Sequence, residues 1–452
     1  MGNLLTSLLN SSNALRVYGE AFNIIQNNIT NANTPGYVKQ DVSLVALPFN
    51  PETMLSGGVM AGPMLSARAS YLENAVRNQQ ELLGSAGQRS ADLGLVEPLF
   101  DLTASFSVPT TINKLFDGFS QLAVSPNDPG ARQNVIELAG QVAQSFHQSA
   151  VGITRVITNV GSQTRGAVAG INRIAEQLAA INHQYRASSA GSQDAGLDAQ
   201  RHAALEELSQ IANFTVLKSA DGGMNVYLGG QTALVIGEHD FAISANSSST
   251  KTLIRDAQGK DITSQVTRGS LGALIQERNV TLPGYLADLN TLAGNFADTV
   301  NTALAQGVDR SGSAPAVNLF SYDPGRAAFT LAVTGITPDQ IAAAKATAPG
   351  GNGNAIAIAQ LSSAPAINGF TFSQFYGNLG ARVGRDVSTA RQESDQYQDA
   401  VTQAQQQRLQ QSGVSLDEEA AKMLQFRQAY QAAGKMITVL DELTQDLLNL
   451  IH

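Results

Sequence analysis

The side chains that most often perform chemistry are few in this sequence, and they are far apart. The chain has five histidines, and none forms a His-x-x-x-His or His-x-Glu pair: His147, His183, His202, His239 and His452. Asp194 with Asp198, and the acidic run at 417–419, have the spacing of carboxylates that serve acid–base or metal chemistry. Capping and a solvated helix face are the commoner uses of such groups.

Motifs that would position a substrate or a phosphate are also missing. The sequence contains no Walker A, Gly-x-Ser-x-Gly or Gly-x-Gly-x-x-Gly pattern. The glycine-rich run at 350–353 lacks the flanking strand and helix of a phosphate loop. We therefore predict no catalytic residue, no cofactor and no metal site, and we expect a protein that is not an enzyme.

The composition favours a folded protein that packs against copies of itself. Charged residues make up 14% of the 452 residues and apolar residues 43%, whereas globular domains usually contain about 25% charged residues. A weakly charged surface repels its own copies little. The net charge of −9 and the lack of any lysine or arginine run predict no binding to nucleic acid.

Cysteine and long apolar stretches are both absent from the sequence. Without cysteine there are no disulfides and no thiolate ligands. No stretch approaches the run of about 20 apolar residues that crosses a bilayer, so we expect no membrane insertion. Residues 1–10 lack the basic and apolar regions of a cleaved signal peptide.

Both ends of the chain have apolar residues that repeat every seven positions, as in the seam of a coiled coil. The N-terminal rows are Leu8, Leu15, Phe22 and Ile29, and Leu4, Tyr18 and Ile25. The C-terminal rows are Leu416, Met423, Tyr430, Ile437 and Ile451, and Phe426, Ala433, Leu440 and Leu447. A seam needs a partner helix, and the obvious partner is the other end of the same chain. Everything between the two helices is then an insertion, and we expect an elongated molecule.

Local signals set the limits of these two helices. The N-terminal helix is expected to stop before Asn33-Thr34-Pro35-Gly36-Tyr37, because proline cannot continue a helix and glycine permits the positive φ of a tight turn. At the other end, Ser415 and Glu418 form a capping box that opens the C-terminal helix.

The region between the ends is predicted to be mostly helical with a small β-rich insert. Residues 42–65 are expected to form a loop or hairpin, and residues 71–210 follow a helical pattern that prolines interrupt. Short strands are expected between 214 and 266, where Asp221-Gly222-Gly223 is a hairpin signal. Helices are expected again at 271–305 and 372–411.

We therefore predict a mainly α fold with three domains. An inner domain of paired coiled-coil helices comprises residues 1–45 and 405–452. A helical middle domain comprises residues 46–213 and 270–404, with loops and short strands at 307–369. A reduced β-rich outer domain comprises residues 214–269.

The stretch at 24–37, which contains Asn33-Thr34-Pro35-Gly36-Tyr37, resembles the N-terminal signature of the flagellar rod, hook and hook-associated protein family. Within that family, further segments are similar to hook-associated members. These segments are residues 37–40, 125–135, 171–209, 271–309 and 414–432, and together they cover most of the chain. The region at 318–368 is short for such a protein, so we expect a reduced outer domain.

The resemblance implies a structural subunit at the hook–filament junction that assembles through its terminal helices. The implied partners are copies of the chain in a helical layer, the hook protein on one side, the next hook-associated protein on the other, and an export chaperone on the C-terminal helix. The implied location is extracellular, in the flagellum, after export without a cleaved signal peptide. The expected assembly contacts are Leu8, Leu15, Phe22, Ile25, Ile29, Met423, Phe426, Tyr430, Ile437, Leu440 and Leu447.

Three other functions fit parts of the sequence. A rod or hook protein shares both ends, but the expected helices at 131–212 argue against it. A flagellin or adhesin-like protein would lack the Asn-Thr-Pro-Gly-Tyr turn. An enzyme would need an active site that the sequence does not indicate.

Overall fold

The computed structural model of the protein describes residues 2–49, 51, 57–187, 194–219, 221–246 and 251–449. Helices dominate this part of the chain and the strands are short, so the predicted mainly α class with a small β-rich insert is confirmed. The chain forms two compact units. Unit 1 contains Met1–Leu83, Gly170–Ile243 and Tyr397–His452, and unit 2 contains Gly84–Ala169 and Ser244–Gln396. Among the described residues, no helix has the length and apolar character that crossing a membrane requires.

Three long helices contribute residues to both units. They are α2 (Ser70–Val96), α4 (Pro129–Ala187) and α10 (Phe372–Ser412).

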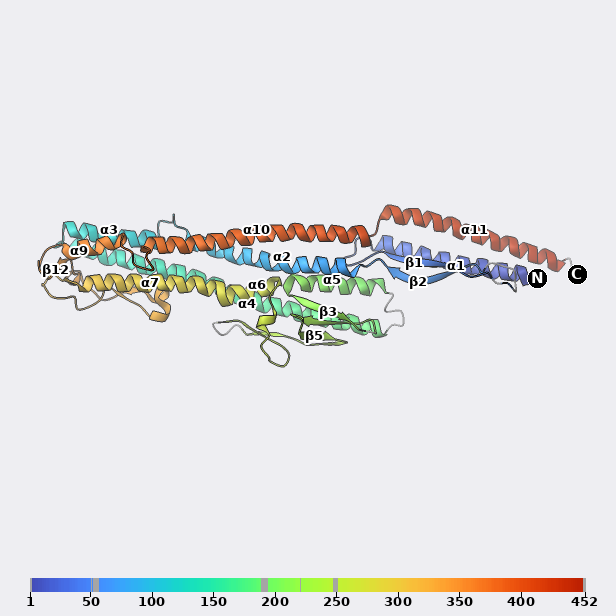
Figure 1. Cartoon of the computed structure of the whole chain (residues 1–452), viewed down its shortest axis with the longest axis horizontal. Coiled ribbons are helices and arrows are strands. Elements are labelled where there is room, and N and C mark those ends of the chain that lie inside the picture. The colour runs from blue at the N-terminus through green and yellow to red at the C-terminus, as the bar shows by residue number, and fades with distance from the viewer. Residues whose placement is uncertain are drawn as a thin grey trace. The chain divides into compact units, whose positions relative to one another are not determined.

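In unit 1 the two terminal helices, α1 (Gly2–Thr30) and α11 (Leu416–Asn449), lie side by side and run antiparallel (Figure 1). Their apolar rows face each other because a spacing of three and four residues places them on one side of each helix. The backbone N–H of Glu418 donates to Ser415 Oγ at 3.4 Å, and three acidic residues occupy the first turn of α11. Ile451, the last member of the predicted row, lies outside the described residues.

The remainder of unit 1 consists of a hairpin, a helix and a sheet. β1 (Gln40–Ala46) and β2 (Val59–Ser66) form an antiparallel hairpin against α1, with Gln40 opposite Ser66. α5 (Ala195–Ile211) leads into a four-stranded antiparallel sheet in the order β3-β4-β5-β6. Its strands are β3 (Phe214–Lys218), β4 (Met224–Leu228), β5 (Thr232–Ile236) and β6 (His239–Asp240).

Unit 2 has a helical core that is centred on aromatic side chains. Its own helices are α3 (Val108–Val124), α6 (Gly269–Gln276), α7 (Leu282–Ala305), α8 (Ala327–Thr330) and α9 (Gly353–Ala359). The ring of Phe296 lies 6.0 Å from that of Phe116, 5.4 Å from that of Phe320 and 5.3 Å from that of Phe372. Each of these side chains is buried. Aromatic contacts of this kind stabilise a core beyond the area that they bury.

Three small antiparallel pairs of strands complete unit 2. They are β7 (Ser244–Asn246) with β8 (Leu253–Arg255), β9 (Gly307–Val308) with β12 (Ala344–Lys345), and β10 (Phe320–Ser321) with β11 (Ala332–Val333).

The expected helix at 271–305 is helical throughout but contains a π-turn at Glu277–Thr281, between α6 and α7. Pro283 follows this turn and has no N–H to donate, so the regular α-helical bonding pattern is interrupted there. Glu277 is fully buried, and its carboxylate forms an ion pair with Arg89 Nε at 3.6 Å. Burial raises the pKa of Glu277 to about 7, and Arg89 opposes that shift.

Candidate functional site

The contact between the two terminal helices is more buried on α1 than on α11. Val17, Ala21, Ile25 and Asn28 are the buried residues of α1, whereas Glu419 is the one residue of α11 that is buried in the described part of the chain. The rest of the α11 face is half-buried, as expected for a helix that one neighbour covers on one side. The rest of its own chain therefore covers only part of the α11 surface.

The structure brings most of the predicted seam residues to this contact. Leu8, Leu15, Phe22 and Ile29 on α1 and Met423, Phe426, Ile437 and Leu440 on α11 are half-buried, and Ile25 is buried. The rings of Tyr18 and Phe426 lie 6.1 Å apart between their centroids. Two predicted residues are more exposed in the single chain, Tyr430 at 49% and Leu447 at 39%.

The sequence prediction missed Val17 and Ala21, which line the inner face of α1. Both are smaller than the leucines and phenylalanine that marked the heptad rows. Their spacing with Ile25 and Asn28, four, four and three residues, is the signal that would have revealed the true buried face.

The turn motif after α1 is divided between solvent and interior. Asn33, Thr34 and Pro35 are exposed, whereas Gly36 and Tyr37 are half-buried. Gly36 has a φ of +76°, and a Cβ at this position would lie 2.3 Å from the carbonyl oxygen of Ala199. Only glycine allows both this backbone conformation and this close approach to α5.

Asn28 connects α1, the turn and α11 through four hydrogen bonds. Its Nδ2 donates to the carbonyl oxygen of Gln40 at 2.8 Å and to Glu419 Oε2 at 2.9 Å. Its Oδ1 accepts from the Gln40 N–H at 2.9 Å and from the Tyr37 hydroxyl at 2.9 Å. The side-chain amide thus uses both donors and both acceptor positions, which is the full capacity of asparagine.

Lysines surround the buried carboxylate of Glu419. Lys39 Nζ lies 4.0 Å and Lys422 Nζ 3.9 Å from Glu419 Oε1, and Lys39 also forms a 2.7 Å ion pair with Glu418. Burial, and to a lesser degree the charge of Glu419, raises the pKa of Tyr37 to about 12. The Tyr37 hydroxyl is therefore protonated at neutral pH and can donate to Asn28.

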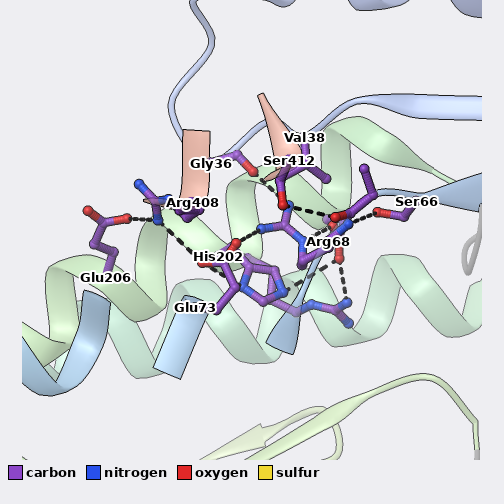
Figure 2. A network of polar contacts seen from close by, with 12 residues as sticks. Gly36, Val38, Ser66, Arg68, Glu73, His202, Glu206, Arg408 and Ser412 are labelled. Carbon is purple, nitrogen blue, oxygen red and sulfur yellow. Dashed lines mark hydrogen bonds and ion pairs between the residues drawn. The ribbon is translucent and has the colours of Figure 1, made fainter. Parts of the chain in front are cut away.

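A second polar network lies where α1 ends and α11 begins, with Arg68 at its centre (Figure 2). Arg68 lies between β2 and α2, and its side chain is largely buried. The guanidinium donates to Glu73 at 2.7 Å, to Asp198 at 2.6 Å and to the carbonyl oxygen of Gly36 at 2.7 Å. One side chain thus connects α2, α5 and the turn motif, and charge-assisted bonds of this kind are the strong ones.

α10 joins the same network where it ends, as Figure 2 shows. Arg408 donates to Glu206 at 2.7 Å and to Glu73 at 3.3 Å. Ser412 Oγ donates to the carbonyl oxygen of Ala67, and the Lys39 N–H donates to the carbonyl oxygen of Ser412. The break between α10 and α11 is therefore attached to both the hairpin and the N-terminal turn.

Part of the network borders an open cavity of about 510 Å³ that is lined by charged side chains of both signs. The buried His202 beside it is neutral, because burial and the nearby Arg68 lower its pKa to about 2. Burial works to raise the pKa of Asp198, but Arg68 and the other cations hold it below the usual value. Within the described residues no group of three or more side chains has the arrangement of a metal site. Four charged side chains of the wall are used in mutual ion pairs, Arg68 with Glu73 and Asp198, and Arg201 with Asp198.

Comparisons with known families identify the family to which the chain belongs. The model of the flagellar hook-associated protein FlgK helical domain matches residues 93–320, which is half of the chain. This chain belongs to the FlgK family of flagellar hook-associated proteins. The C-terminal model of the flagellar basal body rod proteins FlgEFG matches residues 405–450, which contain the end of α10 and all of α11. The family consists of structural proteins of the flagellum.

Individual relatives are similar over most of the chain. Flagellar hook-associated protein 1 of Bacillus subtilis is 26% identical over 96% of this chain and 96% of its own length. The Escherichia coli protein of the same name is 22% identical and covers 99% of this chain and 100% of its own length. The solved structure of the flagellar hook junction protein FlgK from Burkholderia pseudomallei has a TM-score of 0.65 at 18% identity. It covers 75% of this chain and 100% of that one, so the two share a fold.

Proposed function

We propose that this chain is the structural subunit of the hook–filament junction and that it assembles through its terminal helices. The observation that supports the proposal is a set of apolar side chains on α1 and α11 that the chain itself leaves exposed. They include Leu5, Leu9, Met436, Val439 and Leu443. Exposed apolar patches mark surfaces that bind other proteins.

The remaining parts of the proposal concern domains and neighbours. The inner domain (1–45 and 405–452) packs against copies of the chain in a helical layer. The helical middle domain (46–213 and 270–404) and the small outer domain (214–269) lie outside it. The hook protein contacts the layer on one side and the next hook-associated protein on the other, and the subunit reaches its extracellular position without a cleaved signal peptide.

Before export, a dedicated chaperone covers the apolar surface of α11. Phe426→Asp is expected to weaken chaperone binding, because it places a charge on that surface. Unchanged binding in a pull-down with the purified chaperone would show that the chaperone binds elsewhere.

The proposed role is purely structural, without enzymatic activity. A screen of the purified chain for hydrolysis and metal binding is expected to be negative. A reproducible activity would contradict this part of the proposal.

Deletion of the coding region in the source bacterium tests the junction role. We expect cells with hooks and without filaments, and flagellin released into the medium, because the filament has no layer on which to start. Loss of the hook as well would indicate a rod or hook protein, and intact filaments would overturn the proposal.

A further inference from the structure

The apolar residues of α1 and α11 do not by themselves define the register in which the two helices pair. Apolar rows that repeat every seven residues can pair equally well when one helix slides by seven residues. In coiled coils, a single buried polar residue often specifies one register. The contact between α1 and α11 contains such a pair, Asn28 and Glu419, each 1% exposed.

Asn28 is held in place before α11 is considered. Three of its four hydrogen bonds are to the hairpin and the turn: the N–H and carbonyl of Gln40 and the hydroxyl of Tyr37. The amide therefore presents one remaining N–H toward α11, in a fixed direction. Glu419 Oε2 accepts that N–H at 2.9 Å.

A slide of one heptad would separate this pair in either direction. In one direction Glu419 would face the level of Ala21, which is buried and apolar, and Asn28 would face the level of Ser412. In the other direction Asn28 would face the level of Phe426, and Glu419 would pass the end of α1. The first slide leaves a buried carboxylate without a hydrogen-bond donor, and both leave the Asn28 N–H without its acceptor, which costs more than the bond itself contributes.

We propose that the hydrogen bond between Asn28 and Glu419 sets the register in which α11 pairs with α1 of the same chain, together with the attachment of Ser412 to Lys39 and Ala67 just before α11. Asn28 and Glu419 are thus positioning residues for the terminal helix pair. Lys39 and Lys422 flank the Glu419 carboxylate, with Nζ at 4.0 Å and 3.9 Å from its Oε1. The apolar rows supply the affinity between the helices, and the polar pair selects one arrangement among those the rows allow.

This inference deepens the assembly role proposed above, and it rests on that role only for its consequence in the cell. When the two terminal helices pair in one register, the exposed apolar residues Met436, Val439 and Leu443 of α11 lie at a defined position along α1. Identical subunits in a repeating layer require such a defined position. The register itself is a property of the isolated chain. It can therefore be measured whether or not the flagellar assignment holds.

Disulfide trapping measures the register directly, because the chain has no cysteine of its own. Phe426→Cys combined with Tyr18→Cys reports the register of the structure, in which these two side chains meet. Phe426→Cys combined with Ser11→Cys or with Ile25→Cys reports a slide of one heptad in either direction. The purified full-length chains are incubated in a glutathione redox buffer, and the cross-linked fraction of each is measured at equilibrium.

The three reporters are compared in four backgrounds. In the parent chain we expect the native pair to exceed each shifted pair by about tenfold or more, the effect of a hydrogen bond to a charged group. Glu419→Leu is expected to reduce this ratio to near one while the total cross-linked fraction is kept. Glu419→Gln retains an acceptor oxygen and is expected to preserve most of the ratio. Glu418→Leu changes the exposed neighbour and serves as the matched control.

Two results would overturn the proposal. In the first, Glu419→Leu leaves the ratio of native to shifted pairs unchanged, so that the apolar rows alone set the register. In the second, all three cross-links disappear in Glu419→Leu, so that the pair serves association rather than register. Complementation of motility by the same variants is scored separately, and it bears on the assembly role alone.

Discussion

At position 36 the backbone conformation and the packing both require glycine. Its φ of +76° and the 2.3 Å approach of a Cβ to Ala199 oppose any side chain. We expect Gly36→Ala to lower the free energy of unfolding by about 2–3 kcal/mol, through backbone strain and displacement of the turn from α5.

The matched control is Gly19→Ala, because Gly19 lies within α1 and a Cβ there would meet open space. It is expected to raise stability by about 0.5–1 kcal/mol, since alanine is the better helix former. Urea unfolding followed by circular dichroism measures both variants. Equal effects of the two substitutions would contradict the argument for Gly36.

Glu277 provides a prediction for pH dependence. Its folded pKa of about 7 lies above the ordinary value of 4.5, because the carboxyl is buried. Between these two values the folded chain holds a proton that the unfolded chain has lost. Glu277 therefore favours folding at pH 5, and this contribution is lost as the pH rises through 7.

Glu277→Gln is expected to flatten the pH dependence and to raise stability at pH 8 by up to about 3 kcal/mol. Urea unfolding at pH 5 and pH 8 tests this expectation, with the exposed Glu137→Gln as the control. If Glu277→Gln keeps the pH slope of the parent chain, the buried carboxyl is not the titrating group.

At the scale of elements, α11 has two apolar stripes with different neighbours. Phe426, Ile437 and Leu440 face α1 and are half-buried, whereas Met436 and Val439 are 58% and 53% exposed. One helix cannot turn both stripes toward a single partner. The second stripe is therefore available to another chain.

Val439→Asp tests the division between the two stripes. We expect it to change the free energy of unfolding of the isolated chain by less than about 0.5 kcal/mol, because the side chain is exposed. In cells it is expected to abolish filament formation, since a charge would be buried between subunits. Thr438→Asp, on an exposed face beside the stripe, is the control and should leave filaments intact. Loss of stability in the isolated Val439→Asp chain would place this residue in the intramolecular contact instead.

At the scale of the whole molecule, charge governs how copies of the chain approach one another. The chain carries a net charge of −9 with only 14% charged residues, so repulsion between copies is present but weak. Salt shortens the range of this repulsion, from about 10 Å at 0.1 M to about 3 Å at 1 M ionic strength. Apolar association is not screened by salt.

We therefore expect self-association of the purified chain to increase as sodium chloride is raised across this range. Sedimentation velocity at several protein concentrations measures the association. If salt instead separates the copies, ion pairs rather than apolar stripes hold them together.

The sequence by itself determined the helices, the turn and the family. These features depend on local chemistry: the period of the apolar residues, the capping of α11 by Ser415, and the proline and glycine after α1. The same signals could not rank the seam residues by burial within the chain, so they did not single out the buried Val17 and Ala21 and did not separate the exposed Tyr430 and Leu447 from half-buried residues. Burial depends on which side of a helix its neighbour occupies, and periodicity leaves that open within one helix face.

Only the tertiary structure decided which polar residues meet. Asn28 and Glu419 are 391 residues apart in the chain, and Arg68 and Asp198 are 130 apart. Asparagine at the end of a helix and glutamate in the first turn of another are ordinary capping residues when each is considered alone. Their roles arise from the pairing of α1 with α11 and from the packing of α5 against the turn. Those contacts follow from burial summed over the whole chain, so no local pattern contains them.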